Sequence, residues 1–280
     1  MTDAATSPAP PQTPEEALAW FHSRRELSVV QPAGSLALVA RQLVDSEQEV
    51  WGVPGRWAPL AHGESGLRLV ATAADGILVD GEIVDGEVVV AGIDTEKPGV
   101  ISFGTSTGNI APHEGDGYLL RIWDAASDAI ENFGRIDAFP YDPAWVITGT
   151  WQENPEGTTF GFEHLKEEDG NTREEVIPGR ILFRHDGAEY DVVAFASGRA
   201  LQLVFADATS GDSTYSACRF LFLAPNPDST ITLDFNRAIL PPCAFSYSFN
   251  CPMPPKQNRF PFAVEAGEKN VLAKDGSLLH

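Results

Sequence analysis

Residues 66–92, GLRLVATAADGILVDGEIVDGEVVVAG, decide the fold class of this chain. Three Asp-Gly pairs, at positions 75–76, 80–81 and 85–86, separate short runs rich in Val, Ile and Leu. Asp-Gly readily adopts the positive φ angles of tight two-residue turns, so this pattern predicts consecutive β-hairpins. A further pair, Asp186-Gly187, separates RILFRHD from AEYDVVAFA and predicts another hairpin.

Similar short β-prone runs continue to the C-terminal part of the chain, among them YLLRIW, TTFGFEHL, LQLVFAD, RFLFL and TITLDF. Many short strands with turn signals between them predict an all-β fold, mainly an antiparallel sandwich or a partly open barrel. One N-terminal helix is expected over about Pro14 to Glu26. Thr13 offers its N-cap, Pro14 its first position and Glu16 the capping-box partner.

The chain divides by composition into four expected segments. Residues 1–13 form a Pro/Ala/Ser-rich flexible tail, and residues 14–137 hold the helix and a first β region. Residues 138–269 form a second β region, and residues 270–280 a C-terminal tail. Whether the two β regions are separate domains is left open by the sequence.

The charge is strongly acidic, with 40 Asp and Glu against 19 Lys and Arg, a net charge of −21. Such a surface repels phosphate backbones and anionic membranes, so we expect neither nucleic acid nor membrane as a partner. The N-terminus has neither a basic nor an apolar signal region, and no apolar run is long enough to span a bilayer. A cytoplasmic protein is expected. Cofactor and oligomeric state stay unknown.

Residues 233–269, LDFNRAILPPCAFSYSFNCPMPPKQNRFPFAVEAGEK, contain six prolines, two cysteines and two Asn-Arg pairs. Proline removes a backbone donor and fixes φ, so this stretch cannot form a long strand or helix. Its many Phe and Tyr residues argue against disorder. We therefore expect an ordered, polar-lined loop, and a loop of this length is typically functional.

Specific residues from Leu120 onward form a recognisable pattern. They are Leu120, Arg121, Trp123, Asp124, Pro140, Asp142, Pro143, Trp145, Phe205, Asp207, Thr209, Ser210, Gly211, Thr214, Tyr215, Arg219, Leu221, Asp234, Phe235, Asn236, Arg237, Ala238, Pro241, Pro242, Cys243, Cys251, Pro252, Pro254, Pro255, Asn258, Arg259, Gly267 and Glu268. With them the chain resembles the bacterial and archaeal family known as domain of unknown function 1684. The resemblance implies a mostly β fold and brings no assigned reaction.

Three positions depart from the pattern of that family. Cys218 stands where Gly is usual, Leu240 where Asn is usual, and Gln257 where Glu is usual. The last two remove polar groups from the proline-rich loop, which weakens the case for catalysis. No catalytic residue is assigned.

The leading hypothesis is a pocket for a small polar or anionic ligand between the turn Asp207–Tyr215 and the loop Asp234–Glu268. Arginines would supply charge-assisted contacts, asparagines would fix orientation, and the turn would supply hydroxyls. Arg237 is the stronger ligand candidate of the two arginines. The candidate ligand-binding residues are Asp207, Thr209, Ser210, Thr214, Asn236, Arg237, Asn258, Arg259 and Glu268.

Two alternatives stay open beside this hypothesis. The first is a structural or protein-interaction module, in which the same polar residues lock the loop and no small-molecule site exists. The second is a hydrolase-like enzyme, with Asp207 or Glu268 as general base. Convergence of Asp207, Glu268 and the two arginines on a solvent-reached cavity would favour ligand binding, and a closed interior would favour the structural module.

Two further motifs have simpler interpretations. Ser106 is the centre of a literal G-x-S-x-G, but the residues after it do not predict the helix that a nucleophile elbow requires. Cys243 and Cys251 are too loosely spaced for a zinc knuckle, and the six histidines show no paired spacing, so no metal site is predicted. Two buried thiols are favoured over a disulfide.

Overall fold

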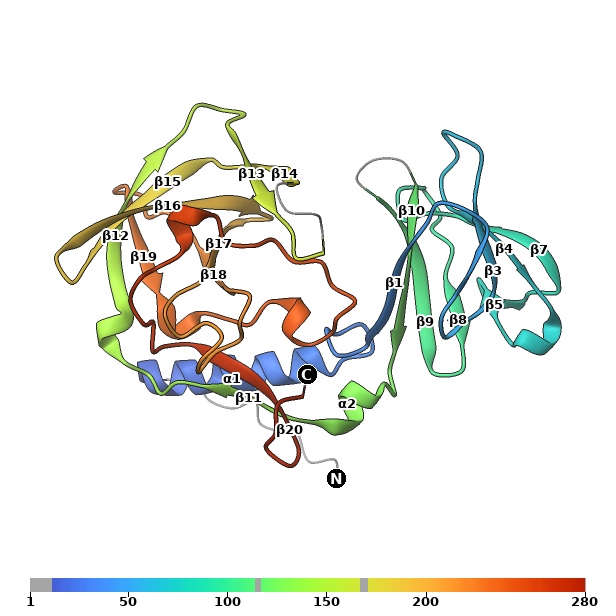
Figure 1. Ribbon diagram of the computed structural model, residues 1–280, viewed down its shortest axis with the longest axis horizontal. Helices are drawn as coiled ribbons and strands as arrows, with labels where there is room; N and C mark the ends of the chain where they lie inside the picture. Colours follow the sequence, from blue (N-terminus) through green and yellow to red (C-terminus); the bar gives the residue numbers. More distant parts are fainter. Residues whose placement is uncertain (1–11, 114–116, 167–170, 280) are drawn as a thin grey trace, which may run out of the picture.

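The computed structural model describes residues 12–113, 117–166 and 171–279 (Figure 1). The regular structure is mostly antiparallel β with one long N-terminal helix, which confirms the predicted fold class. Two β lobes lie side by side in Figure 1, one built from strands β1 to β10 (residues 38–124) and the other from strand β12 (Val146–Glu153) onward. Residues 1–11, most of the predicted N-terminal tail, lie outside the described residues.

Two of the four Asp-Gly pairs form the predicted two-residue hairpins. Asp85-Gly86 does not, because it leads into β7 (Gly86–Val90), which pairs with β4 (Leu67–Ala71) in the other sheet. Asp80 and Gly81 have φ angles of 53° and 87° and join β5 to β6 as a two-residue hairpin. Asp186 and Gly187, at 48° and 79°, join β15 to β16 in the same way. Gly76 instead ends a short 3-10 turn in a left-handed conformation. These strands are β5 (Leu78–Val79), β6 (Glu82–Ile83), β15 (Gly179–His185) and β16 (Ala188–Ser197), and the 3-10 turn is η1 (Ala73–Asp75).

The first lobe contains a six-stranded sheet of order β1-β10-β9-β8-β5-β6 and a four-stranded sheet of order β2-β3-β4-β7. Their buried faces share one apolar core that includes Trp57, Leu69 and Ile110. This arrangement is typical of a sandwich. The remaining strands are β1 (Leu38–Val44), β2 (Gln48–Val50), β3 (Val53–Pro59), β4 (Leu67–Ala71), β7 (Gly86–Val90), β8 (Ile101–Phe103), β9 (Ser106–Pro112) and β10 (Tyr118–Asp124).

The second lobe is a curled six-stranded sheet of order β18-β17-β16-β15-β12-β19. An isolated bridge between Pro225 and Ile231 brings the two edge strands together, so the sheet forms a partly open barrel. Its interior is aromatic, with the Phe205 ring 5.3 Å from that of Phe235 and 5.7 Å from that of Phe260. The strands are β12 (Val146–Glu153), β17 (Ala200–Phe205), β18 (Arg219–Leu223) and β19 (Thr230–Asp234), with a separate ribbon of β13 (Thr159–Glu163) and β14 (Thr172–Val176).

Helix α1 (Pro14–Val29) lies beside the second lobe, next to the two-stranded ribbon of β11 (Phe133–Ala138) and β20 (Glu268–Ala273) (Figure 1). It begins with the predicted capping box of Thr13 and Glu16. The short helix α2 (Asp128–Asn132) precedes β11. The tail predicted from residue 270 is wrong at its start, because residues 270–273 complete β20 and pair with β11. None of the helices in the described part of the chain is long and apolar enough to cross a membrane.

Candidate functional site

A fully buried ion pair joins Asp207, just after β17, to Arg219 at the start of β18. The Arg219 Nη2 lies 2.8 Å from the Asp207 Oδ2, and both side chains have 0% exposure. The guanidinium also donates to the backbone oxygens of Val264 and Ala266, and at 3.4 Å to that of Glu268. Burial lowers the pKa of Arg219, and the charge of Asp207 opposes this shift. Asp207 therefore has a protein cation as its partner, not a ligand.

The hydroxyl-rich turn after Asp207 satisfies its own polar groups. The Asp207 Oδ1 accepts hydrogen bonds from the Thr209 amide at 2.9 Å, the Thr209 hydroxyl at 2.7 Å and the Val264 amide at 3.1 Å. The Thr209 and Thr214 hydroxyls lie 2.9 Å apart, and the Ser210 hydroxyl accepts from the Asp207 amide. Thr209 and Thr214 are buried. Asx- and ST-type bonding of this kind fixes a turn locally.

Glu268, at the start of β20, is also fully buried and paired. Its carboxylate accepts from the Arg25 Nε at 2.8 Å and the Arg25 Nη2 at 3.2 Å, and from the Leu240 amide at 2.7 Å. The side chain of Arg25 is 19% exposed. This bidentate pair attaches helix α1 to the proline-rich loop, and it is a strong charge-assisted contact.

His22 lies on α1 near this pair, and its Nε2 is buried without a hydrogen-bond partner within the described part of the chain. Burial lowers the pKa of His22, although the nearby charge of Glu268 opposes the shift. A histidine with a lowered pKa is held neutral in the native state, so protonation favours the unfolded chain.

We therefore expect His22 to make the native state less stable as the pH falls through the unfolded-state value of about 6.5. Urea unfolding of the wild type and of His22→Leu between pH 5 and pH 7.5 measures this contribution. The stability difference between the two proteins should shift in favour of His22→Leu at the lower pH. A difference that stays constant with pH would contradict the assignment.

The two asparagines of the Asn-Arg pairs anchor backbone. Asn236, in η3 (Phe235–Arg237), accepts from the Asp142 amide and donates to the Asp142 carbonyl, both at 2.9 Å. Asn258, in η5 (Lys256–Asn258), accepts from the Val193 amide at 3.1 Å and donates to the Val193 and Val204 carbonyls at 2.9 and 2.8 Å. Asn258 has 0% exposure, so its amide completes the hydrogen bonding of the barrel wall.

The two arginines of these pairs are exposed and lie in different surroundings. The Arg237 guanidinium sits 5.2 Å from the centre of the Phe21 ring on α1. The Arg259 Nε donates to the Pro254 carbonyl at 3.1 Å. The structure thus links Asp207 through Arg219 to the backbone of Glu268, whose carboxylate pairs with Arg25, and it places Arg237 and Arg259 outside that closed network.

Sequence reasoning missed the partners of this network. Arg219 was part of the recognised pattern but was not proposed as a site residue, and Arg25 was only one of several charges on the predicted helix. Glu268 is 243 residues from Arg25, a separation that local pattern does not bridge. For Arg219, the available signal was its place at the start of an apolar strand, where an isolated charge requires a buried partner.

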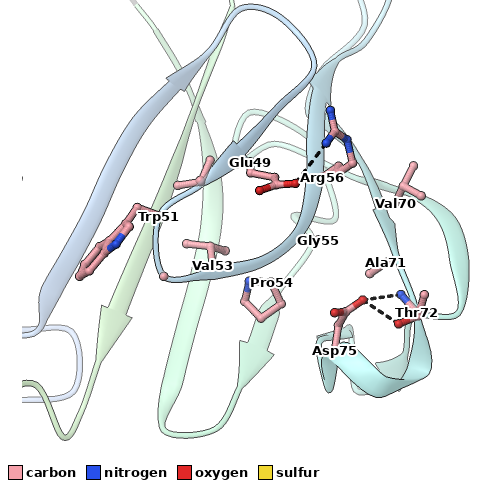
Figure 2. Close-up of a pocket in the computed structure, with 12 residues that line it drawn as sticks. Glu49, Trp51, Val53, Pro54, Gly55, Arg56, Val70, Ala71, Thr72 and Asp75 are labelled. Atoms are coloured by element: carbon pink, nitrogen blue, oxygen red, sulfur yellow. Dashed lines mark hydrogen bonds and ion pairs between the residues drawn. The ribbon is translucent and has the colours of Figure 1, made fainter.

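A groove of about 980 Å³ lies on the first lobe (Figure 2). Its charged side chains already have partners. Figure 2 shows Arg56 paired with Glu49, at 3.1 Å, and the Asp75 carboxylate accepting from the amide and hydroxyl of Thr72. Trp51, 93% exposed, lies at one end of the groove on the β2–β3 hairpin. The charged side chains that line this groove, Glu49, Arg56 and Asp75, are thus all engaged within the protein.

A smaller cavity of about 380 Å³ lies beside the proline-rich loop. It combines the exposed Arg259 with the cation of Lys256 and the amide of Gln257, and among the described residues Glu163 is the acidic one that lines it. No hydrogen bond or ion pair within the described residues involves the two terminal nitrogens of Arg259 or the ammonium of Lys256. The cavity is lined by Phe160, Gly161, Glu163, Thr172, Met253, Pro254, Pro255, Lys256, Gln257 and Arg259.

The described residues also bear on two other chemistries, nucleophilic catalysis by Ser106 and metal binding. Ser106 is at the start of β9, in the hairpin that follows β8, so it lacks the strand–turn–helix setting of a nucleophile elbow. No group of three or more His, Cys, Asp and Glu side chains in the described part of the chain could hold a metal ion.

The fold and this site define a β protein with a sandwich lobe, a partly open barrel and a buried Asp–Arg–Glu network. Residues 131–269 match the family model described as "Protein of unknown function (DUF1684)", and the chain belongs to this family. It is 33% identical to an uncharacterized protein from gene locus rrnAC0354 of Haloarcula marismortui, solved by solution NMR. That match covers 49% of this chain and 77% of the other, with a TM-score of 0.41. No curated protein matches the sequence.

Proposed function

We propose that this protein binds a small anionic ligand in the cavity beside the proline-rich loop, with Arg259 and Lys256 as its cationic contacts. One observation carries the proposal. Arg259 lines the cavity and its Nε is held by the Pro254 carbonyl, while its terminal nitrogens have no protein partner within the described residues. An arginine in this state presents a planar pair of donors that matches a carboxylate or phosphate.

The loop that carries these cations is rigidly attached to the barrel. Asn258, between Lys256 and Arg259 in sequence, makes three buried hydrogen bonds to the backbone of β16 and β17. An isolated parallel β-bridge between Ala206 and Arg259 also attaches the loop to the barrel. Prolines at 254 and 255 limit the backbone freedom on the other side. A rigid site loses little conformational entropy when the ligand binds, which favours affinity.

The local charge supports an anion despite the acidic surface of the whole protein. Among the described residues, two cations and one carboxylate line the cavity, whereas the chain as a whole carries a net charge of −21. Binding of an anion would explain why two cations lie together at one site of such an acidic protein. The volume of about 380 Å³ lies at the lower end of the range for ligand cavities, which suits a small phosphate or carboxylate compound.

The test is titration of the protein with phosphate, sulfate and citrate by isothermal calorimetry at low ionic strength. Arg259→Ala should weaken the binding of the anion that the wild type prefers by about 10- to 100-fold, as expected for the loss of charge-assisted hydrogen bonds. Its free energy of unfolding without anion should change by less than about 1 kcal/mol, because the side chain is exposed.

Arg237→Ala is the matched control. It removes an exposed arginine from the other Asn-Arg pair, and Arg237 contacts Phe21 on α1 instead of lining this cavity. It should bind anions as the wild type does. Equal weakening in both variants would indicate a general charge effect, and no binding by the wild type would leave the structural-module alternative as the better account.

A further inference from the structure

The three cysteines of this chain all lie in one buried apolar cluster of the second lobe. Cys218 precedes β18, Cys243 is in η4 (Pro242–Ala244), and Cys251 follows in the proline-rich loop. All three are free thiols. Free cysteines are often buried for packing alone, so what distinguishes this cluster is the contact between two of them.

Cys243 and Cys251 contact each other directly, and Cys218 is held differently. The Cys243 amide donates to the Cys251 sulfur at 3.3 Å, and the two thiols influence each other's pKa. The Cys218 thiol instead donates to the Pro252 carbonyl at 3.7 Å. The geometry therefore selects one pair out of the three possible ones.

We propose that Cys243 and Cys251 are an oxidisable dithiol, which a hydroperoxide converts into an intramolecular disulfide. This site is independent of the proposed anion cavity. In the first step the Cys243 thiolate attacks the peroxide oxygen, the O–O bond breaks, and Cys243 becomes a sulfenic acid while water or an alcohol leaves. In the second step the Cys251 sulfur attacks the sulfenic sulfur, the S–O bond breaks and water leaves. The two thiols lose two electrons in total, and the peroxide gains them.

The environment distinguishes the roles of the two thiols. The hydrogen bond from Cys251 lowers the pKa of Cys243, the thiol that attacks. The same contact, together with burial, raises the pKa of Cys251, the thiol that resolves. The thiolate is the reactive form, so this asymmetry matches the order of the two steps.

A small oxidant would reach the two buried thiols through local opening of the segment between them. Cys243 and Cys251 are 2% and 5% exposed, whereas Tyr247 between them is 69% exposed. No regular helix or strand spans residues 245–250. Segments of this kind open locally at lower cost than the barrel strands around them. A disulfide would close this short loop at its base.

The experiment is to treat the reduced full chain with hydrogen peroxide, denature it and count the free thiols. Three thiols before treatment should become one, and dithiothreitol should restore three. Cys218→Ser should go from two thiols to none. Cys251→Ser should form no intramolecular disulfide, and dimedone should trap a sulfenic acid on Cys243. Circular dichroism checks that each variant is folded.

Peptide mapping identifies the pair that forms. A disulfide between residues 243 and 251 supports the inference. A pair that includes Cys218, an intermolecular disulfide, or three thiols that survive peroxide treatment in the folded protein would overturn it.

Discussion

Arg219→Ala should destabilise the protein by on the order of 3–5 kcal/mol, because it leaves the Asp207 carboxylate buried without a counter-charge. Both side chains of the pair have 0% exposure, and the guanidinium also satisfies the backbone oxygens of Val264 and Ala266. Urea unfolding monitored by fluorescence and circular dichroism measures the loss. In the same experiment Asp207→Ala should be strongly destabilising as well, because Arg219 is then the unpaired charge.

Arg184→Ala is the control for this prediction. Arg184 is 3.0 Å from Glu189, but the two side chains are 68% and 76% exposed. A pair in solvent contributes little, so this variant should lose less than about 1 kcal/mol. If Arg219→Ala cost no more than Arg184→Ala, the buried network would not have the structural role assigned to it.

The second large effect is expected for Asn258→Ala, which should cost about 3 kcal/mol. The substitution leaves the amide of Val193 and the carbonyls of Val193 and Val204 without partners in a buried wall, and an unsatisfied buried polar group costs about 1–3 kcal/mol. Because Asn258 also fixes the loop of the anion cavity, this variant should bind anions more weakly than the wild type.

Asn226→Ala is the control for the Asn258→Ala prediction. Asn226 is exposed and bonds to Thr230, far from the cavity loop in sequence, so its loss should change stability and binding little. An Asn258→Ala protein as stable as Asn226→Ala would contradict the anchoring role of Asn258.

The fold class was predictable because its signals are local. Asp80-Gly81 and Asp186-Gly187 have the positive φ angles that their residue types favour, and the capping box at Thr13 begins α1 as expected. The end of the chain was not predictable in this way. Residues 270–273 form a strand because β11 pairs with them, and that partner is distant in sequence.

The candidate site was predictable in its residues but not in their pairing. Asp207, Asn258 and Glu268 were selected for their residue types, and each does make buried polar contacts. Their actual partners are Arg219, the backbone of β16 and β17, and Arg25. These partners are brought together by barrel closure and helix packing, which sequence pattern alone does not specify.

Anomalous scattering from crystals soaked in selenate tests the central claim most directly, because it locates a bound anion without assuming its contacts. The account predicts a selenium peak in the cavity beside the proline-rich loop, within hydrogen-bonding distance of the Arg259 terminal nitrogens and near Lys256. That peak should disappear in Arg259→Ala crystals and persist in Arg237→Ala crystals. A selenate bound instead at Arg237, with the Arg259 cavity empty, would contradict the account.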